Sequence, residues 1–180
     1  MVYVFLANGF EEIEALTPVD VLRRGGVEVV TVGVGSKTIV GSHNIIVEAD
    51  IIDSQLTGFE GTEAVVLPGG MPGTLNLEAC RIVQQAIRYC DEKGIIIGAI
   101  CAAPSILGHA GILMNRKAVC FPSFESELKG YLPTDEYVCR DGHIITAKGM
   151  GVSLDFGLAL LAAVRSSTIS DKVRTAVQCR

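Results

Sequence analysis

The sequence predicts an α/β protein built on a doubly wound, mostly parallel sheet. Three observations support this prediction. Short apolar runs alternate along the chain with segments of helical spacing, which is the pattern of strands joined by crossover helices. The apolar runs are nearly continuous in Val and Ile, as in strands covered on both faces. Hydrophobic residues make up 49% of the 180 residues and charged residues only 19%, which suits a buried sheet.

The first half of the chain opens with an apolar run that ends at a turn signal, Asn8-Gly9. The acidic residues that follow suit the positive end of a helix dipole, and Gly25-Gly26 is typical of a helix C-terminus. A second apolar run and a small hairpin come next. The predicted elements are a strand at Val2–Ala7, a helix from Glu11 to Arg24, a strand at Val27–Val32, and a hairpin of Thr38–Val40 with Ile45–Val47.

The second half repeats the alternation of strand and helix, so we expect one domain over residues 1–180. Asp141-Gly142 is the strongest hairpin signal in the chain. The predicted strands are Ala64–Leu67, Ile95–Ile100, Ala118–Cys120, Tyr137–Cys139 and Ile144–Thr146. The predicted helices are Glu78–Lys93, Ala102–Leu113, Ser153–Val164 and Ile169–Val177.

Charge and hydropathy exclude several kinds of partner. The net charge is −5 and no basic block is present, so we expect no nucleic-acid partner. No stretch approaches the roughly 20 apolar residues of a membrane span. The short apolar start lacks the basic segment of a signal peptide, and we expect a cytoplasmic protein. The six cysteines contain no Cys-x-x-Cys pair and no matching Cys/His cluster, so we expect no metal site.

Cys101 is the strongest candidate for a reactive residue. Doubly wound sheets bind ligands beyond the carboxyl ends of their strands, and that rule selects Asn8–Glu14, Pro68–Gly73 and Cys101–Pro104 together. Small residues surround the thiol, as a sharp strand-to-helix turn requires. We expect the following helix, with its free N–H groups and positive end, to favour the thiolate. A buried core cysteine is the alternative interpretation of this segment alone.

Two further segments supply candidate partners for the thiol. Gly69 and Gly70 end a strand, where their N–H groups could form an oxyanion hole, although an ordinary tight turn is the alternative. Glu14 precedes Pro18 by one helical turn, and proline cannot donate a hydrogen bond to the Glu14 carbonyl, so we expect the helix to kink or open there. A carboxyl group at such a break could hydrogen-bond the thiolate and relay protons. We expect the remaining acids of this turn, Glu11 and Glu12, to be solvated.

In combination, several motifs spread over nearly the whole chain resemble the ThiJ/PfpI superfamily, in the branch of the parkinsonism-associated protein deglycase (DJ-one) and its bacterial relatives. The matching segments are Ala7-Asn-Gly-Phe-Glu-Glu-Ile-Glu-Ala15, Pro18-Val-Asp-Val-Leu-Arg-Arg-Gly-Gly26, Val65-Val-Leu-Pro-Gly-Gly70, Ala99-Ile-Cys-Ala-Ala-Pro104 and Thr146-Ala-Lys-Gly-Met-Gly151. The resemblance implies a flavodoxin-like three-layer sandwich, usually a homodimer. It also implies that Cys101 is the reactive thiol and Glu14 its acid partner, with the amides of Gly70 and Ala102 as oxyanion donors.

The resemblance implies a cofactor-independent enzyme that converts methylglyoxal or glyoxal to hydroxy acids, in the manner of a glyoxalase III, or that removes early glycation adducts as a protein deglycase. Its substrate would be a small reactive carbonyl or a glycated protein. One alternative is a non-enzymatic sensor of oxidative stress or chaperone, which would act through oxidation of Cys101. A role in thiazole monophosphate biosynthesis is a further alternative, but no basic residue near the proposed site suits a phosphate.

The chain departs from its relatives at several pocket positions. Ala102 follows the cysteine where the peptidase branch has His, so we do not expect a peptidase. Phe121 stands where the human deglycase-like proteins have a pocket His, and Met150 where relatives often have Pro; both are predicted to line the pocket with Gly69. Cys120 is a candidate resolving thiol, with a buried hydrophobe as the alternative. The histidines, for which we expect structural roles, are His43, His109 and His143.

Overall fold

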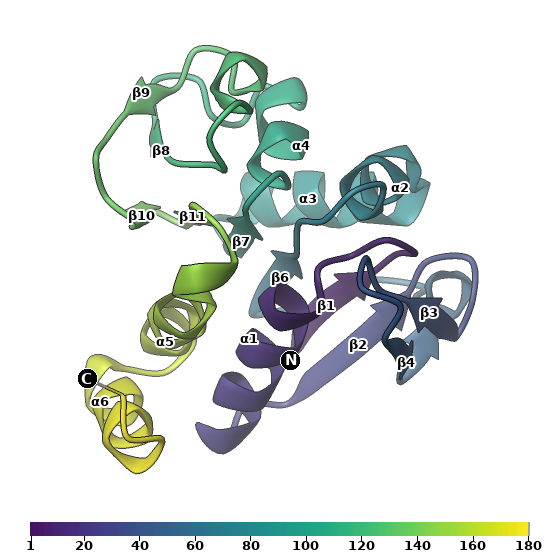
Figure 1. Ribbon diagram of the computed structural model, residues 1–180, viewed down its shortest axis with the longest axis horizontal. Coiled ribbons are helices and arrows are strands. Elements are labelled where there is room, and N and C mark those ends of the chain that lie inside the picture. The colour runs from purple at the N-terminus through teal and green to yellow at the C-terminus, as the bar shows by residue number, and fades with distance from the viewer. Residues whose placement is uncertain (180) are drawn as a thin grey trace.

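The computed structural model, shown in Figure 1, describes residues 1–179. In these residues a seven-stranded sheet forms the middle layer of the protein. The strand order is β10-β11-β7-β6-β1-β2-β5, and every neighbouring pair is parallel except β10 with β11. The strands of this sheet are β1 (Val2–Leu6), β2 (Val29–Gly33), β5 (Ile51–Ile52), β6 (Ala64–Leu67), β7 (Ile96–Ile100), β10 (Val138–Asp141) and β11 (Ile144–Ala147). The doubly wound, mostly parallel sheet predicted from the sequence is therefore confirmed.

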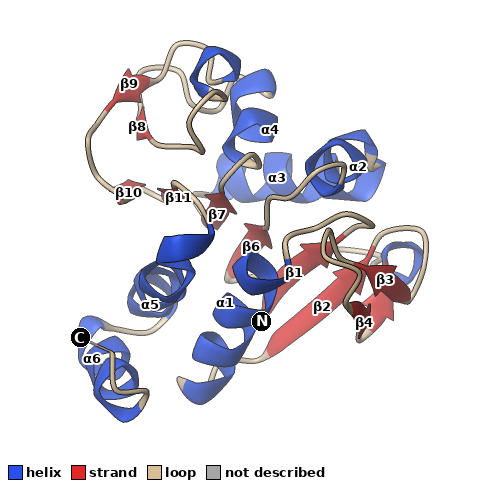
Figure 2. Cartoon of the chain, in the orientation of Figure 1, coloured by secondary structure: helices blue, strands red, loops and turns tan. Residues whose placement is uncertain are grey.

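Helices cover both faces of the sheet (Figure 2). They are α1 (Glu12–Arg24), α2 (Gly73–Ala79), α3 (Arg81–Lys93), α4 (Pro104–His109), α5 (Ser153–Val164) and α6 (Ser167–Ala176). Short 3₁₀ turns are η1 (Asp53–Gln55), η2 (Glu125–Glu127) and η3 (Met150–Val152). Two small sheets lie outside the main one: β3 (Thr38–Val40) with β4 (Ile46–Glu48), and β8 (Lys117–Ala118) with β9 (Leu132–Pro133).

Two apolar cores, one on each face, explain why the strands are apolar throughout. In β1, Tyr3 and Phe5 pack into the core under α3 and α4, whereas Val2, Val4 and Leu6 pack into the core under α1 and α5. Successive side chains of a strand point to opposite faces, so a sheet covered on both faces needs an apolar residue at every position. Among the described residues, no helix combines the length and the apolar character that crossing a bilayer requires.

Two predicted helices differ from the observed ones. The helix expected at Glu78–Lys93 is interrupted at Cys80, whose extended backbone (φ −77°, ψ 119°) separates α2 from α3. The helix expected at Ala102–Leu113 is shortened to α4, because Gly111 takes a left-handed conformation (φ +77°) soon after His109. The candidate cysteine is therefore followed by a helix of only six residues.

Candidate active site

Cys101 lies on the turn that joins β7 to α4. Its backbone has φ +65°, a left-handed conformation that is uncommon for a residue with a side chain. Two hydrogen bonds hold it there: its N–H donates to the Ala147 carbonyl (2.9 Å), and its carbonyl accepts the N–H of Phe121 (2.8 Å). A strained residue fixed from both sides at the carboxyl edge of a sheet is typical of functional sites. The thiol is partly exposed, whereas Cys80, Cys90, Cys120 and Cys139 are buried.

Glu14 approaches the same point from the first turn of α1. Its side chain is 1% exposed, and its Oε2 accepts the N–H of Gly69 (3.0 Å) in the loop after β6. The loop and the helix are also joined through Glu11, whose N–H donates to the Gly69 carbonyl (2.9 Å). Because β1, β6 and β7 are parallel neighbours, the three loops selected by the sequence meet at one edge. Helix α1 runs through Pro18 as one element, so the helix is not broken there; the kink expected as the other possibility stays a prediction.

The Glu14 carboxyl group and the Cys101 thiol are hydrogen-bonded to each other. Burial raises the pKa of Glu14 to about 7. Burial, together with the neighbouring Glu14 carboxylate, raises the pKa of Cys101 to about 12. The N–H of Ala102, at the start of the following turn, acts to lower the pKa of the thiol as expected, but burial and the Glu14 carboxylate outweigh it. Between these two values the pair holds one proton, and a thiolate forms when that proton lies on Glu14.

The expected oxyanion donors surround the sulfur. The N–H groups of Ala102 and Gly70 both hydrogen-bond Cys101 and act to lower the pKa of its thiol. Gly70 has φ +89°, and a Cβ at this position would lie 2.4 Å from the backbone nitrogen of Glu11. Only glycine can present its N–H to the sulfur there. Two N–H groups that converge on a nucleophile can also stabilise an oxyanion formed next to it.

Of the three predicted pocket residues, Phe121 and Met150 line a groove beside the pair, whereas Gly69 does not. Gly69 lies behind the pair and donates to Glu14 (3.0 Å). The side chain of Phe121 is 47% exposed, and that of Met150 is 50% exposed. The backbone N–H of Met150 hydrogen-bonds the Glu14 carboxyl group and acts to lower its pKa. Both side chains border a groove of about 460 Å³.

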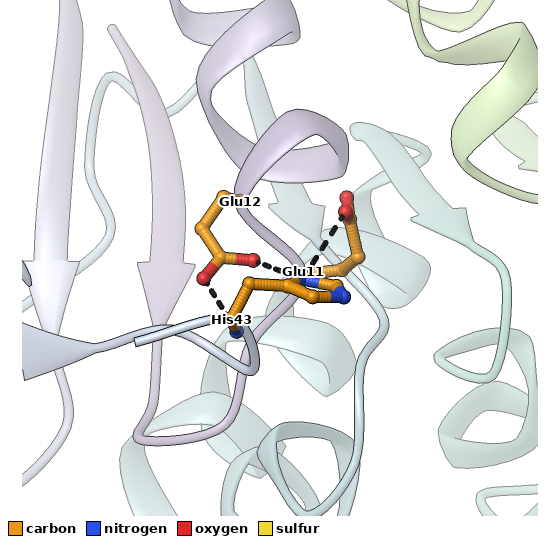
Figure 3. Close-up of side chains that lie close together, drawn as sticks. All are labelled: Glu11, Glu12 and His43. Atoms are coloured by element: carbon orange, nitrogen blue, oxygen red, sulfur yellow. Dashed lines mark hydrogen bonds and ion pairs between the residues drawn. The ribbon is translucent and has the colours of Figure 1, made fainter. Parts of the chain in front are cut away.

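Glu12 differs from the solvated residue expected from the sequence. Its carboxylate is buried beneath the loop between β3 and β4, where it accepts the backbone N–H of His43 (2.7 Å) and contacts Nδ1 of the same residue (2.9 Å), as Figure 3 shows. Burial opposes ionisation, but these hydrogen bonds outweigh it and lower the pKa of Glu12 to about 2. Glu12 thus fastens the small hairpin to α1, and no local sequence pattern indicates this contact, because the two partners are 31 residues apart.

Glu11, Glu12 and His43 also offer one ligand atom each within 4.8 Å, the spacing of a metal site. Protein donors already occupy these carboxylates. Glu11 Oε2 accepts the N–H of Glu14 (2.7 Å), and Glu12 accepts the bonds from His43. The trio is therefore explained as the N-terminal cap of α1 and the anchor of the hairpin.

The other histidines also pair with carboxylates. His109, at the end of α4, contacts Glu78 through Nδ1 (2.6 Å) and Glu127 through Nε2 (2.9 Å). His143 contacts Asp91 (2.9 Å). These pairings support structural roles. Burial raises the pKa of the Cys120 thiol to about 11, as suits the alternative of a buried hydrophobe, while its role as a resolving thiol stays a prediction.

A buried acid beside a cysteine at the strand ends of a flavodoxin-like sheet defines a class of α/β proteins. Comparison with known proteins identifies the family. The sequence model of the DJ-1/PfpI family matches residues 1–163, and the chain belongs to this family. "Glutathione-independent glyoxalase DJR-1.2" of Caenorhabditis elegans is 29% identical over 84% of this chain and 81% of its own. "Toxoplasma gondii DJ-1, oxidized" superposes with a TM-score of 0.94 at 29% identity, covering 98% of this chain and 97% of that one.

Plant relatives are longer than this chain. "Protein DJ-1 homolog A" of Arabidopsis thaliana is 32% identical over 99% of this chain, which spans 46% of the plant protein. The chain spans 37% of "Protein DJ-1 homolog B" from the same plant.

Proposed function

We propose that this protein is a cysteine-dependent enzyme of the glyoxalase or deglycase type, which acts without a cofactor on small reactive carbonyls such as methylglyoxal or on early glycation adducts. The hydrogen-bonded pair of Glu14 and Cys101, with the N–H groups of Gly70 and Ala102 around the sulfur, carries this proposal. The name of the Caenorhabditis elegans relative, a glutathione-independent glyoxalase, also supports the proposal.

The chemistry proposed for a 2-oxoaldehyde needs only these groups. With its proton on Glu14, Cys101 attacks the aldehyde carbon, and the oxygen takes up negative charge beside the two N–H groups. Glu14 gives its proton to that oxygen, which forms a hemithioacetal. The Glu14 carboxylate then removes the proton from the former aldehyde carbon and returns it to the neighbouring ketone carbon, while the hydroxyl proton of the hemithioacetal passes to the ketone oxygen. The first carbon is oxidised to a thioester while the second is reduced to an alcohol, so no external oxidant takes part.

Hydrolysis completes the cycle. Water attacks the thioester carbonyl, the carbon–sulfur bond breaks, and a 2-hydroxy acid leaves while the pair regains its single proton. Glu14 is suited both to donate and to accept protons, because its pKa of about 7 is close to neutral pH.

Purified protein with methylglyoxal tests this proposal by the formation of lactate. We expect turnover in the wild type, and we expect it to fall to background in Cys101→Ser and Glu14→Gln. Cys120→Ser is the matched control, since it removes a buried neighbouring thiol. Wild-type turnover no faster than that of the Cys101→Ser variant, both with methylglyoxal and with a larger 2-oxoaldehyde, would refute the proposed activity.

A second candidate function is supported by the unequal exposure of the thiols. Cys101 and Cys179 are partly exposed while the other four cysteines are buried, so peroxide should reach these two first; of the two, Cys101 lies at the candidate site. We propose as the alternative that oxidation of Cys101 to a sulfinate, with peroxide supplying both oxygens, serves a sensor or chaperone role. Intact-mass measurement after mild peroxide treatment should place two oxygens on Cys101 first. Oxidation spread over all the thiols would argue against this role.

We also propose a homodimer. Exposed apolar side chains lie on α1 (Ile13, 47%, and Leu16, 36%) and on or beside the small hairpin (Ile45, 53%, and Ile46, 67%). Exposed apolar side chains on these two elements suit contact with a second copy of the chain. Light scattering on the purified protein measures the oligomeric state directly.

A further inference from the structure

An apolar groove opens beside the candidate pair, and the chemistry proposed above does not use it. Its volume is about 460 Å³, within the range of about 300–1,000 Å³ that small-molecule pockets occupy. The side chains that line it are mostly apolar: Phe121, Pro122, Tyr137, Met150 and Val152. Three of these, Phe121, Tyr137 and Met150, are about half exposed or more.

Residues that line the groove also contact Cys101 and Glu14. Phe121 is tied to the cysteine by the hydrogen bond from its N–H to the Cys101 carbonyl (2.8 Å). Gly149 joins the groove to the acid, because a Cβ at this position would lie 3.3 Å from the Phe121 ring and 3.9 Å from Glu14 Oε1. The ring and the carboxylate therefore flank the same glycine. Met150 lies next in the chain, and its N–H hydrogen-bonds Glu14.

The positions of the reacting groups direct the rest of a substrate into this groove. A carbonyl attacked by Cys101 must turn its oxygen towards the N–H groups of Gly70 and Ala102. The backbone of Gly69 closes the side behind the pair, where even a methyl group would lie 2.6 Å from Cys101 Cβ and 2.7 Å from Glu14 Oε2. The substituent on the carbonyl therefore extends past Gly149, between Phe121 and Met150.

Charge in the groove favours an uncharged substituent. Its basic side chain, Lys148, holds its ammonium 4.7 Å above the centre of the Tyr137 ring and 3.4 Å from the Asp135 carbonyl. The ammonium thus has partners within the protein, and the other side chains that line the groove are apolar or phenolic. Aromatic rings such as Phe121 and Tyr137 pack well against a flat apolar group.

We infer that the preferred substrates are 2-oxoaldehydes with an aromatic or bulky aliphatic substituent, and that Phe121 and Met150 are the residues that determine this specificity. The inference rests on the proposed function, because it names the substrate class of the same site. It makes methylglyoxal, whose substituent is a single methyl group, a poor substrate compared with phenylglyoxal.

The test compares kcat/KM for phenylglyoxal with kcat/KM for methylglyoxal, by loss of aldehyde, in the wild type and in variants. The ratio between variants cancels the different intrinsic reactivity of the two aldehydes. We expect Phe121→Ala to lower the ratio on the order of 10-fold, and Met150→Ala to lower it roughly 4-fold. Phe121→Leu should restore most of the preference, because it keeps an apolar side chain.

Met114→Ala is the matched control, since Met114 is 55% exposed and does not line the groove. It should leave the ratio unchanged. Thermal melting verifies that each variant folds. If Phe121→Ala does not fold, the comparison of Met150→Ala and Phe121→Leu with the wild type tests the inference instead. Turnover of both aldehydes with the same ratio in wild type, Phe121→Ala and Met150→Ala would overturn this inference alone. If the wild type turned over neither of the two aldehydes, the proposed function would be overturned as well.

Discussion

Replacing Gly69 by alanine tests the close approach of backbone to the candidate pair. A Cβ at this position would lie 2.6 Å from Cys101 Cβ, 2.7 Å from Glu14 Oε2 and 3.0 Å from the carbonyl oxygen of Ile100. Carbon atoms pack best at about 3.5–4.0 Å, so the two side chains would have to move by close to 1 Å. The Ile100 carbonyl belongs to the end of buried strand β7 and cannot move away easily.

The expected loss of stability follows from this overlap. Forcing an extra methyl group into a packed site costs about 1–3 kcal/mol. For a domain of this length, 1 kcal/mol shifts Tm by about 2–4 °C, so Gly69→Ala should lower Tm by about 2–12 °C. The displacement should also weaken the hydrogen bond from the residue 69 N–H to Glu14 and change the rate at which iodoacetamide alkylates Cys101. Thermal melting and intact-mass kinetics measure the two effects.

Gly151→Ala is the control, because a Cβ at Gly151 has no neighbour within 4 Å. Its Tm should be unchanged or slightly higher, since alanine restricts the unfolded chain. If Gly69→Ala has the same Tm as Gly151→Ala, and iodoacetamide alkylates its Cys101 at the wild-type rate, the proposed packing of Gly69 against the pair is refuted.

Two further predictions concern pH. The pKa of Glu14 is raised from 4.5 to about 7, so the folded state favours its protonated form; this contribution is full below 4.5 and is lost as pH rises to about 7. The free energy of unfolding of Glu14→Gln, measured with urea, should therefore exceed that of the wild type by up to about 3 kcal/mol at pH 8. An increase of the same size at pH 4.5 would contradict this prediction. Glu127 and Glu78 raise the pKa of His109 above 6.5, so protonated His109 stabilises the folded state. This stabilisation is lost as pH rises through the raised pKa. His109→Gln should therefore melt roughly 1–3 °C below wild type at pH 6 and together with it at pH 9; an equal deficit at both pH values would argue for lost packing instead.

The sequence was sufficient for six of the seven strands of the main sheet, all but the two-residue edge strand β5, and for the meeting of three loops, because these follow from local patterns. Apolar runs mark strands, and parallel strands place the residues that follow them at one edge. This placed Glu14, Gly70 and Cys101 together without knowledge of side-chain positions. The resemblance to relatives then gave each of them a role.

Contacts between distant residues could not be predicted in this way. Glu12 resembled a solvated acid at the start of a helix, and its burial depends on a loop about 30 residues later that folds over it. His109 similarly bridges two acids 31 and 18 residues away in the chain. The pKa of Cys101 depends on burial and on a neighbouring charge, both of which are tertiary properties. The N–H groups of Ala102 and Gly70 act in the opposite direction but do not outweigh them.

The buried acid itself is an argument for chemistry at this site. Glu14 is 1% exposed, no cation is among the groups that shift its pKa, and it faces a thiol rather than a positive charge. Glutamine at this position could still accept the N–H of Gly69 and would avoid burying a carboxylate next to a thiol, so stability alone favours the amide. The acid differs from the amide in one respect that matters here, which is that it can exchange a proton with Cys101 near neutral pH. A residue that lowers stability and holds a proton at the required pH is best explained by catalysis or by control of the thiol.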